Sequence, residues 1–241
     1  MSSFTLDSKT IPFQEGDTIM DAALVAGAYV PYLCHRPGYP PDGSCKVCTV
    51  TVDGRNGAAC TLRAREGMVV QTETPELADM RRALVEMLFV EGNHTCPACE
   101  KTGECELQAV AYHVGMLATR FDLMFPARDL DASHPNVVLD RNRCILCGLC
   151  VRASRDVDGK NVFGIGGRGI RSRLIVNAAS GRLGDTDLSA DDAAVDVCPV
   201  GAILRKRQAY QTPVGERKYD LRPISEVAVE HARRVKERSG A

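Results

Sequence analysis

The sequence has no tryptophan, and aromatic residues make up only 5% of its 241 residues. It has no apolar run approaching the roughly 20 residues that span a membrane, and its first residues, MSSFTLDSKTIPF, lack the basic and apolar regions of a secretory signal. Its formal net charge is −1, so there is no large basic excess for binding nucleic acid. We therefore expect a cytoplasmic protein with no transmembrane segment and no nucleic-acid partner.

Cysteine, in contrast, is abundant, with 11 residues. An odd count argues against the disulfide framework of a small secreted protein. The 11 cysteines and His94 make three complete sets of four, and thiolate and imidazole bind iron–sulfur clusters and zinc. The pattern predicts three metal sites in series, and the alternative is a few structural cysteines with chance CxxC pairs. The three sets are Cys34, Cys45, Cys48 and Cys60; His94, Cys96, Cys99 and Cys105; and Cys144, Cys147, Cys150 and Cys198.

Residues 1–73 have the pattern of a β-grasp ferredoxin domain. Two short strands flank a turn at residues 7–9, Asp17 is a candidate N-cap for the next helix, and KVCTVTV alternates as a strand does. The cysteine spacing, Cys34-x10-Cys45-x2-Cys48-x11-Cys60, differs from the plant-type x4 spacing, which indicates a variant of that fold. Four thiolates also suit zinc, so zinc remains the alternative at this site.

The sequence pattern of residues 74–135 predicts a ligand loop between two helices. The first helix begins at Pro75 and ends at Gly92, and the second continues to Leu117. The loop reads His-x-Cys-x2-Cys-x5-Cys and is suited to a [4Fe–4S] cluster. Replacing one anionic thiolate by the neutral imidazole of His94 makes such a cluster less negative, which raises its reduction potential. The other histidines that we considered are interpreted as structural or loop residues: His35, His113 and His134.

Residues 136–210 contain CxxCxxC, from Cys144 to Cys150, and a remote Cys198 followed by proline. This is the bacterial ferredoxin signature for [4Fe–4S]. No second CxxCxxC is present, so Cys198 should close the same cluster, in a ferredoxin-like domain.

Two further segments complete the chain. The glycines of GIGGRG match a dinucleotide-binding pattern, but IRSRLIV follows as a strand instead of a helix, so we predict a tight turn or bulge. We expect the chain itself to bind no flavin or NAD. Residues 211–241 read as a basic, partly helical tail that is either solvated or docks another subunit, with RKYDLRP as an extended arm.

The order of the three motifs over about residues 1–210 resembles the N-terminal iron–sulfur region shared by several redox families. These are the large iron–sulfur subunit of respiratory complex I, iron-only hydrogenases, NAD-dependent formate dehydrogenase and the diaphorase small subunit of NAD-reducing [NiFe]-hydrogenases. The resemblance implies one [2Fe–2S] cluster on the first set of cysteines and one [4Fe–4S] cluster on each of the other two sets. The fold it implies is α+β, with a β-grasp domain, a small helical segment that carries the histidine and three cysteines of the second set, and a ferredoxin-like domain.

Two features favour the hydrogenase diaphorase family within this group. The chain continues for 43 residues after Cys198 without further cysteines, and one residue, Thr95, separates His94 from Cys96, as in EGNHTCPACEKTGECELQA. The resemblance implies a non-catalytic electron-transfer subunit of an oxidoreductase heteromultimer. Its partners would be a flavin- and NAD-binding diaphorase large subunit and a [NiFe]-hydrogenase small subunit. An iron–sulfur subunit of a formate dehydrogenase or a complex I-like NADH dehydrogenase, and a zinc-binding scaffold, remain as alternatives.

Overall fold

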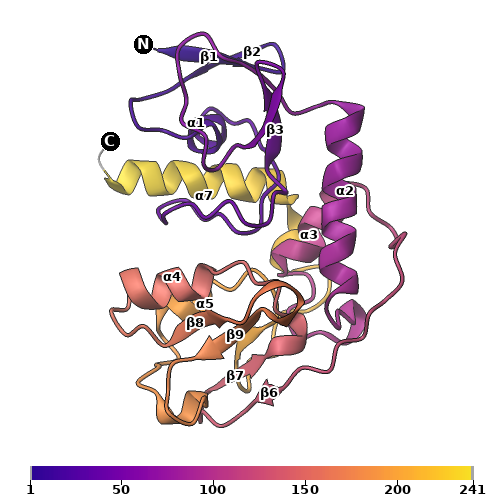
Figure 1. Ribbon diagram of the computed structural model, residues 1–241, viewed down its shortest axis with the longest axis vertical. Helices are drawn as coiled ribbons and strands as arrows, with labels where there is room; N and C mark the ends of the chain where they lie inside the picture. Colours follow the sequence, from indigo (N-terminus) through magenta and orange to yellow (C-terminus); the bar gives the residue numbers. More distant parts are fainter. Residues whose placement is uncertain (1, 240–241) are drawn as a thin grey trace. The chain divides into compact units, whose positions relative to one another are not determined.

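A computed structural model describes residues 2–239 of the chain (Figure 1). The chain divides into two compact units. The first unit comprises Met1–Glu86, Ala109–Ala118 and Arg222–Ala241, and the second comprises Met87–Gln108 and Thr119–Leu221. Among the described residues, no helix is both long and apolar enough to cross a bilayer.

A five-stranded sheet in the order β2-β1-β5-β3-β4 is the framework of the first unit. Strand β1 pairs antiparallel with β2 and parallel with β5. Asp7 and Ser8 connect β1 to β2 with φ values of 44° and 69°, the left-handed conformations that tight hairpin turns require. The predicted hairpin at residues 7–9 is therefore confirmed. The strands are β1 (Ser3–Leu6), β2 (Lys9–Pro12), β3 (Thr49–Val52), β4 (Arg55–Ala58) and β5 (Val69–Gln71).

Two helices from opposite ends of the chain pack in the core of this unit (Figure 1). They are α1 (Ile19–Val25) and α7 (Ile224–Ser239), and α7 buries Ala228 and Ala232 in the core shared with α1 and the sheet. Arg233 Nε donates a hydrogen bond to the carbonyl of Val25, with an N···O distance of 3.0 Å. Residues 224–239 are therefore part of a folded core and not a solvated tail.

The N-cap of α1 lies one residue later than expected. Thr18 Oγ1 accepts a hydrogen bond from the Asp21 amide at 3.1 Å. The carboxylate of Asp17 is used elsewhere, because it accepts from the Gln14 amide at 2.9 Å and lies 3.3 Å from Lys236 Nζ. Asp17 thus closes the preceding turn and Thr18 caps the helix.

Helix α2 (Pro75–Val90) and helix α3 (Glu106–His113) flank the second group of cysteines, as the sequence predicted. Helix α3 is shorter than expected. Gly115 adopts a left-handed φ of 68° and the Met116 amide donates back to the Ala111 carbonyl at 2.9 Å, a typical glycine C-terminus. Leu117 lies beyond this end and is 94% exposed, so its apparent place in the helical stripe was misleading.

The second unit contains two small sheets and a helix pair. Strand β7 (Val137–Asp140) lies between β10 (Ile203–Arg205) and β6 (Leu130–Asp131). Strands β8 (Phe163–Gly166) and β9 (Arg173–Val176) form an antiparallel hairpin, which confirms the turn predicted for the glycine-rich segment. Its remaining helices are α4 (Leu149–Asp156), α5 (Ala193–Asp196) and α6 (Lys218–Leu221), with the short 3-10 helices η1 (Cys96–Ala98), η2 (Arg141–Arg143), η3 (Gly169–Arg171) and η4 (Leu183–Asp185).

Candidate metal centres

The first set of cysteines lies together in the loops of the first unit. The sulfur atoms of Cys48 and Cys60 are 3.4 Å apart, and Cys34 interacts by side-chain hydrogen bonds with Cys45 and Cys60. Cys34, Cys48 and Cys60 are buried, and Cys45 is half-buried. The structure thus gathers all four residues of this set.

The crowding of these thiols perturbs their acidity in opposite directions. Hydrogen bonds from Cys45 and Cys60 lower the pKa of Cys34. The same hydrogen bonds with Cys34 raise the pKa of the partner thiols, Cys45 and Cys60. Four adjacent thiols cannot all ionise without a counter-charge, because like charges at short range disfavour ionisation. Iron or zinc supplies that charge and binds the thiolate form.

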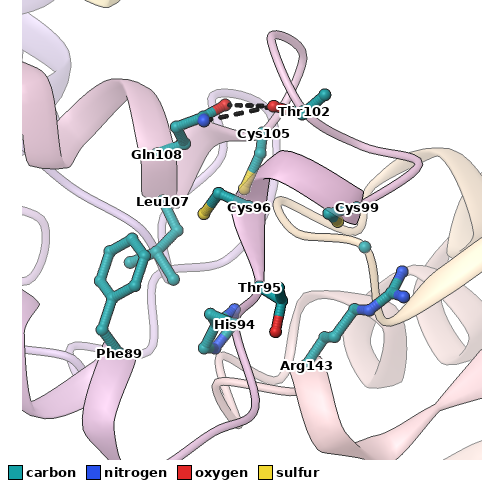
Figure 2. Close-up of a pocket in the computed structure, with 11 residues that line it drawn as sticks. Phe89, His94, Thr95, Cys96, Cys99, Thr102, Cys105, Leu107, Gln108 and Arg143 are labelled. Carbon is teal, nitrogen blue, oxygen red and sulfur yellow. Dashed lines mark hydrogen bonds between the residues drawn. The ribbon is translucent and has the colours of Figure 1, made fainter. Parts of the chain in front are cut away.

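The second set lines one pocket of the second unit, shown in Figure 2. Cys96 lies on η1, Cys99 ends that short helix, and Cys105 directly precedes α3. Phe89 from α2 and Arg143 from η2 complete the wall beside His94. The structure therefore brings together His94, Cys96, Cys99 and Cys105 around one space.

His94 shows that this pocket is suited to a ligand. Its Nε2 atom is buried and has no hydrogen-bond partner among the described residues. Burial, followed by the charges of Arg143 and Arg128, lowers the pKa of His94 to about 4, so its imidazole is neutral at pH 7. A buried nitrogen without a partner is costly, and a neutral imidazole is the form that binds metal. Iron at this nitrogen would satisfy it.

Burial also favours the neutral form of two thiols near His94. Burial raises the pKa of Cys96, and it raises that of Cys105 to about 12. Iron binding would replace these thiol protons, so loading this site should release protons.

The C-terminal part of the second unit fastens this ligand loop. Tyr210 Oη donates to the Ala98 carbonyl at 2.8 Å, and the Tyr219 amide donates to the Gly103 carbonyl at 2.9 Å. Tyr219 lies on α6, in the segment RKYDLRP that was expected to be extended, so that expectation was wrong. Tyr210 and Tyr219 thus contact the backbone of the loop that carries the second set.

The third set lines a separate pocket of the second unit. Cys144 and Cys147 come from the loop leading into α4, Cys150 lies in the first turn of α4, and Cys198 follows α5. Burial raises the pKa of Cys150 well above that of an ordinary thiol, and it raises that of Cys144 to about 11. Apolar side chains complete the wall: Ile145, Ile165, Leu174 and Ile203.

The donor sets fit clusters in which side chains are distributed over several iron atoms. Within residues 2–239, no group of three or more His, Cys, Asp or Glu side chains converges on a position for a single metal ion. In an iron–sulfur cluster each iron takes one or two side chains, and bridging sulfides supply its other ligands. Apolar walls and neutral thiol or imidazole donors are consistent with such a group at the second and third sites.

Three other histidines, His35, His113 and His134, contact residues outside the candidate ligand sets. His35 Nε2 lies 3.3 Å from Asp21 Oδ1, and the His113 ring meets Tyr29 edge-on at 4.9 Å. His134, predicted as a loop residue, is buried; its Nε2 lies 2.9 Å from the Leu188 carbonyl and its Nδ1 accepts from the Val137 amide at 3.1 Å. It connects segments of the second unit.

Arg143 is a site residue that the sequence analysis missed. Its guanidinium lines the second pocket, forms an ion pair with Glu100 and lies 3.0 Å from Asp140 Oδ2. In the sequence it directly precedes Cys144 of the third set, and nothing in the spacing indicates that its side chain turns to the second.

Three family models match successive parts of the chain, and each match contains one of the three sets of candidate ligands. A 2Fe-2S iron–sulfur cluster binding domain matches residues 1–75. The NADH-ubiquinone oxidoreductase-G iron–sulfur binding region matches residues 81–120, and a 4Fe-4S single cluster domain matches residues 137–204. The protein is thus an α+β iron–sulfur protein with one 2Fe-2S and two 4Fe-4S binding domains.

Relatives define the family more closely. The chain is 44% identical over 227 residues to the gamma subunit of the NAD-reducing hydrogenase HoxS of Cupriavidus necator, covering 94% of this chain and 96% of the relative. A chain in the crystal structure of an NAD+-reducing [NiFe]-hydrogenase in the H2-reduced state matches with a TM-score of 0.92 and 52% identity, over 96% of this chain and 98% of that one. The chain belongs to the family of gamma subunits of NAD-reducing hydrogenases, as its motifs suggested.

The resemblance to complex I subunits is also confirmed, over part of their length. The G subunit of NADH-quinone oxidoreductase from Rickettsia prowazekii is 28% identical over 234 residues, which cover 96% of this chain and 34% of the relative. The alpha subunit of the NADPH-Fe(3+) oxidoreductase of Geobacter sulfurreducens is 31% identical, with 24% of its length covered. The chain thus spans about a quarter to a third of these longer proteins.

Proposed function

We propose that this protein is the electron-transfer subunit of a cytoplasmic NAD-reducing hydrogenase. It would relay single electrons between a flavin/NAD(H) diaphorase large subunit and a [NiFe]-hydrogenase small subunit. The observation that carries the proposal is the gathering of all 11 cysteines and His94 into three groups of four. Near full-length similarity to a hydrogenase gamma subunit supports this choice of partners.

Each group of ligands has an assigned cofactor in this proposal. Cys34, Cys45, Cys48 and Cys60 would hold one [2Fe–2S] cluster; His94, Cys96, Cys99 and Cys105 one [4Fe–4S] cluster; and Cys144, Cys147, Cys150 and Cys198 the other. When bound, these groups supply one-electron redox chemistry.

The chain's own residues bind, shield and tune these groups. The Ile145, Ile165 and Leu174 side chains limit water at the third site, and Phe89 does so at the second. Neutral His94 lowers the negative charge at the second site, and Arg143 adds a positive charge to its wall. Such burial and nearby charge set reduction potentials. No residue needs to act as an acid, base or nucleophile.

The alternative assembly is a complex I-like or formate-oxidising complex. The similarity to the G subunit of NADH-quinone oxidoreductase supports this second candidate, because the shared region contains all three cluster-binding domains. The longer relatives extend well beyond this region, whereas the hydrogenase gamma subunit is nearly matched from end to end.

The three candidate assemblies are distinguished by isolating the complex from the native organism through a tag on this chain, under anaerobic conditions. The hydrogenase assignment predicts co-purifying flavin and nickel, and NAD+ reduction by H2. A complex that reduces NAD+ with formate and lacks nickel would replace this assignment by the formate dehydrogenase alternative. A complex with quinone-dependent NADH oxidation and no nickel would instead support the complex I-like alternative.

A further inference from the structure

The ligand loops of the second and third sites are joined by a backbone hydrogen bond. The Glu106 amide donates to the Pro199 carbonyl, with an N···O distance of 2.8 Å. Glu106 directly follows Cys105 of the second set, and Pro199 directly follows Cys198 of the third set. A ligand of one site is therefore linked to a ligand of the other by covalent bonds and this one hydrogen bond.

The hydrogen bond is shielded from water, and its donor is an amide at the start of a helix. Glu106 is the first residue of α3, so its amide has no partner within the helix. Glu106 and Pro199 are both buried, which keeps water from competing for the bond. Losing a buried bond of this kind leaves a polar group without a partner and is costly, so the contact is a fixed part of the unit.

Two further contacts hold the same loops together. A Cβ atom placed on Gly201 would lie 3.1 Å from Cys99 Sγ, so the chain after Pro199 packs against a second-site sulfur. Arg143, which adjoins Cys144 of the third set, reaches into the second pocket and contacts Glu100. These are side-chain or van der Waals contacts, whereas the Glu106–Pro199 bond connects ligand-bearing peptides directly.

We propose that electrons pass between the second and third sites through the Pro199 carbonyl and the Glu106 amide. This inference rests on the proposed function. With both groups bound, one would be oxidised and the other reduced by a single electron, with no proton transferred and no bond broken. Electron tunnelling decays more slowly through bonded atoms than across a gap, so the hydrogen bond shortens the effective path.

The substitution Glu106→Pro tests the route because it deletes the donor at a position where proline is tolerated. Proline is compatible with the first residue of a helix. Proline also disfavours a helical conformation in the residue before it, and Cys105 is not helical. Glu106→Ala is the matched control, because it removes the same side chain and keeps the amide. Replacing residue 106 by lactic acid, the ester counterpart of alanine, provides a second donor deletion that keeps the helical geometry.

The measurement uses the full chain, purified anaerobically with its iron. Freeze-quench EPR after flash photoreduction follows electron equilibration between the two [4Fe–4S] sites, which the imidazole ligand of one makes spectroscopically distinct. Iron content and the two midpoint potentials are measured for every variant. Hydrogen–deuterium exchange of the peptide carrying Glu106 gives an independent readout, in which the amide should be protected in the wild type and in Glu106→Ala.

The proposal predicts equilibration several-fold slower in both donor deletions than in Glu106→Ala, with unchanged iron content and potentials. Equal rates in a deletion variant that keeps its iron would overturn this route and leave the relay intact. If only the Glu106→Pro variant lost its iron, the rate in the lactic acid variant would decide between these two outcomes. Wild-type chain without iron–sulfur clusters would instead refute the proposed function, and the route with it.

Discussion

His94 is the residue at which a nitrogen replaces a sulfur among the proposed ligands. Its buried Nε2 atom and depressed pKa make it a neutral donor within a cluster of thiols. A neutral ligand leaves the bound group one unit less negative than four thiolates would, which favours the reduced state.

The substitution His94→Cys should keep the iron of the second site and lower its midpoint potential, because thiolate adds a negative charge. EPR-monitored redox titration measures this shift, with His94→Ala as the control that should lose about four irons. A potential unchanged in His94→Cys, together with full iron in His94→Ala, would remove His94 from the ligand set.

Arg143 places a positive charge in the wall of the same pocket. The substitution Arg143→Gln should lower the midpoint potential of the second site, because it leaves the negative charges of Glu100 and Asp140 without their partner. Arg143→Lys should preserve most of the potential, since it keeps the charge. The same redox titration compares the two, and identical potentials in all three proteins would show that the guanidinium does not tune this site.

The sequence was sufficient to group the candidate ligands, but it did not identify their neighbours. The three cysteine spacings, one of them with His94, predicted three sets, and the structure gathers each one. Arg143 and Gly201 were missed, because each belongs by sequence to the third segment and by contact to the second site. Local spacing carries no information on which distant loop a side chain meets.

At the scale of elements, the start of helix α4 requires a left-handed backbone conformation in the loop that carries the third set of cysteines. Gly148 is the N-cap of α4 and has a left-handed φ of 67°, between Cys147 and Cys150. A Cβ there meets only the end of the Arg152 side chain, at 3.3 Å, so the cost of a substitution is conformational.

The substitution Gly148→Ala should destabilise the second unit by about 1–2 kcal/mol, the cost of a left-handed non-glycine residue. Thermal unfolding of the iron-loaded protein measures it. Gly148→Asn should cost less, because asparagine tolerates this conformation better than alanine does. Equal stability of Gly148→Ala and the wild type would contradict this account of the loop.

Helix α7 shows what the sequence pattern could not predict. The tail was expected to be partly helical, but a helical pattern does not identify the core that the helix joins. The structure packs α7 against α1, about 200 residues earlier in the chain. The proposed docking role of residues 211–241 stays a prediction, now limited to the faces that this packing leaves exposed.

The substitution Ala232→Asp should destabilise the first unit by about 2 kcal/mol or more, because it buries a charge without a partner. Glu237→Asp, on the exposed part of the same helix, is the control and should be nearly neutral. Unfolding monitored by circular dichroism and by loss of the [2Fe–2S] signal distinguishes them. A stable Ala232→Asp variant with an intact signal would show that α7 is dispensable to this core.

At the scale of the whole molecule, three four-residue donor sets are distributed over two compact units, one in the first and two in the second. Metal binding is coupled to folding in such sites, so the clusters should stabilise the units as well as transfer electrons. The central claim is that these sets hold iron–sulfur clusters.

The most direct test is the iron and acid-labile sulfide content of the full chain purified anaerobically, with an EPR spectrum after reduction. The account predicts about ten irons and ten sulfides per chain, from one [2Fe–2S] and two [4Fe–4S] clusters. About three zincs per chain with neither iron nor sulfide would contradict the redox function and favour a zinc-binding scaffold.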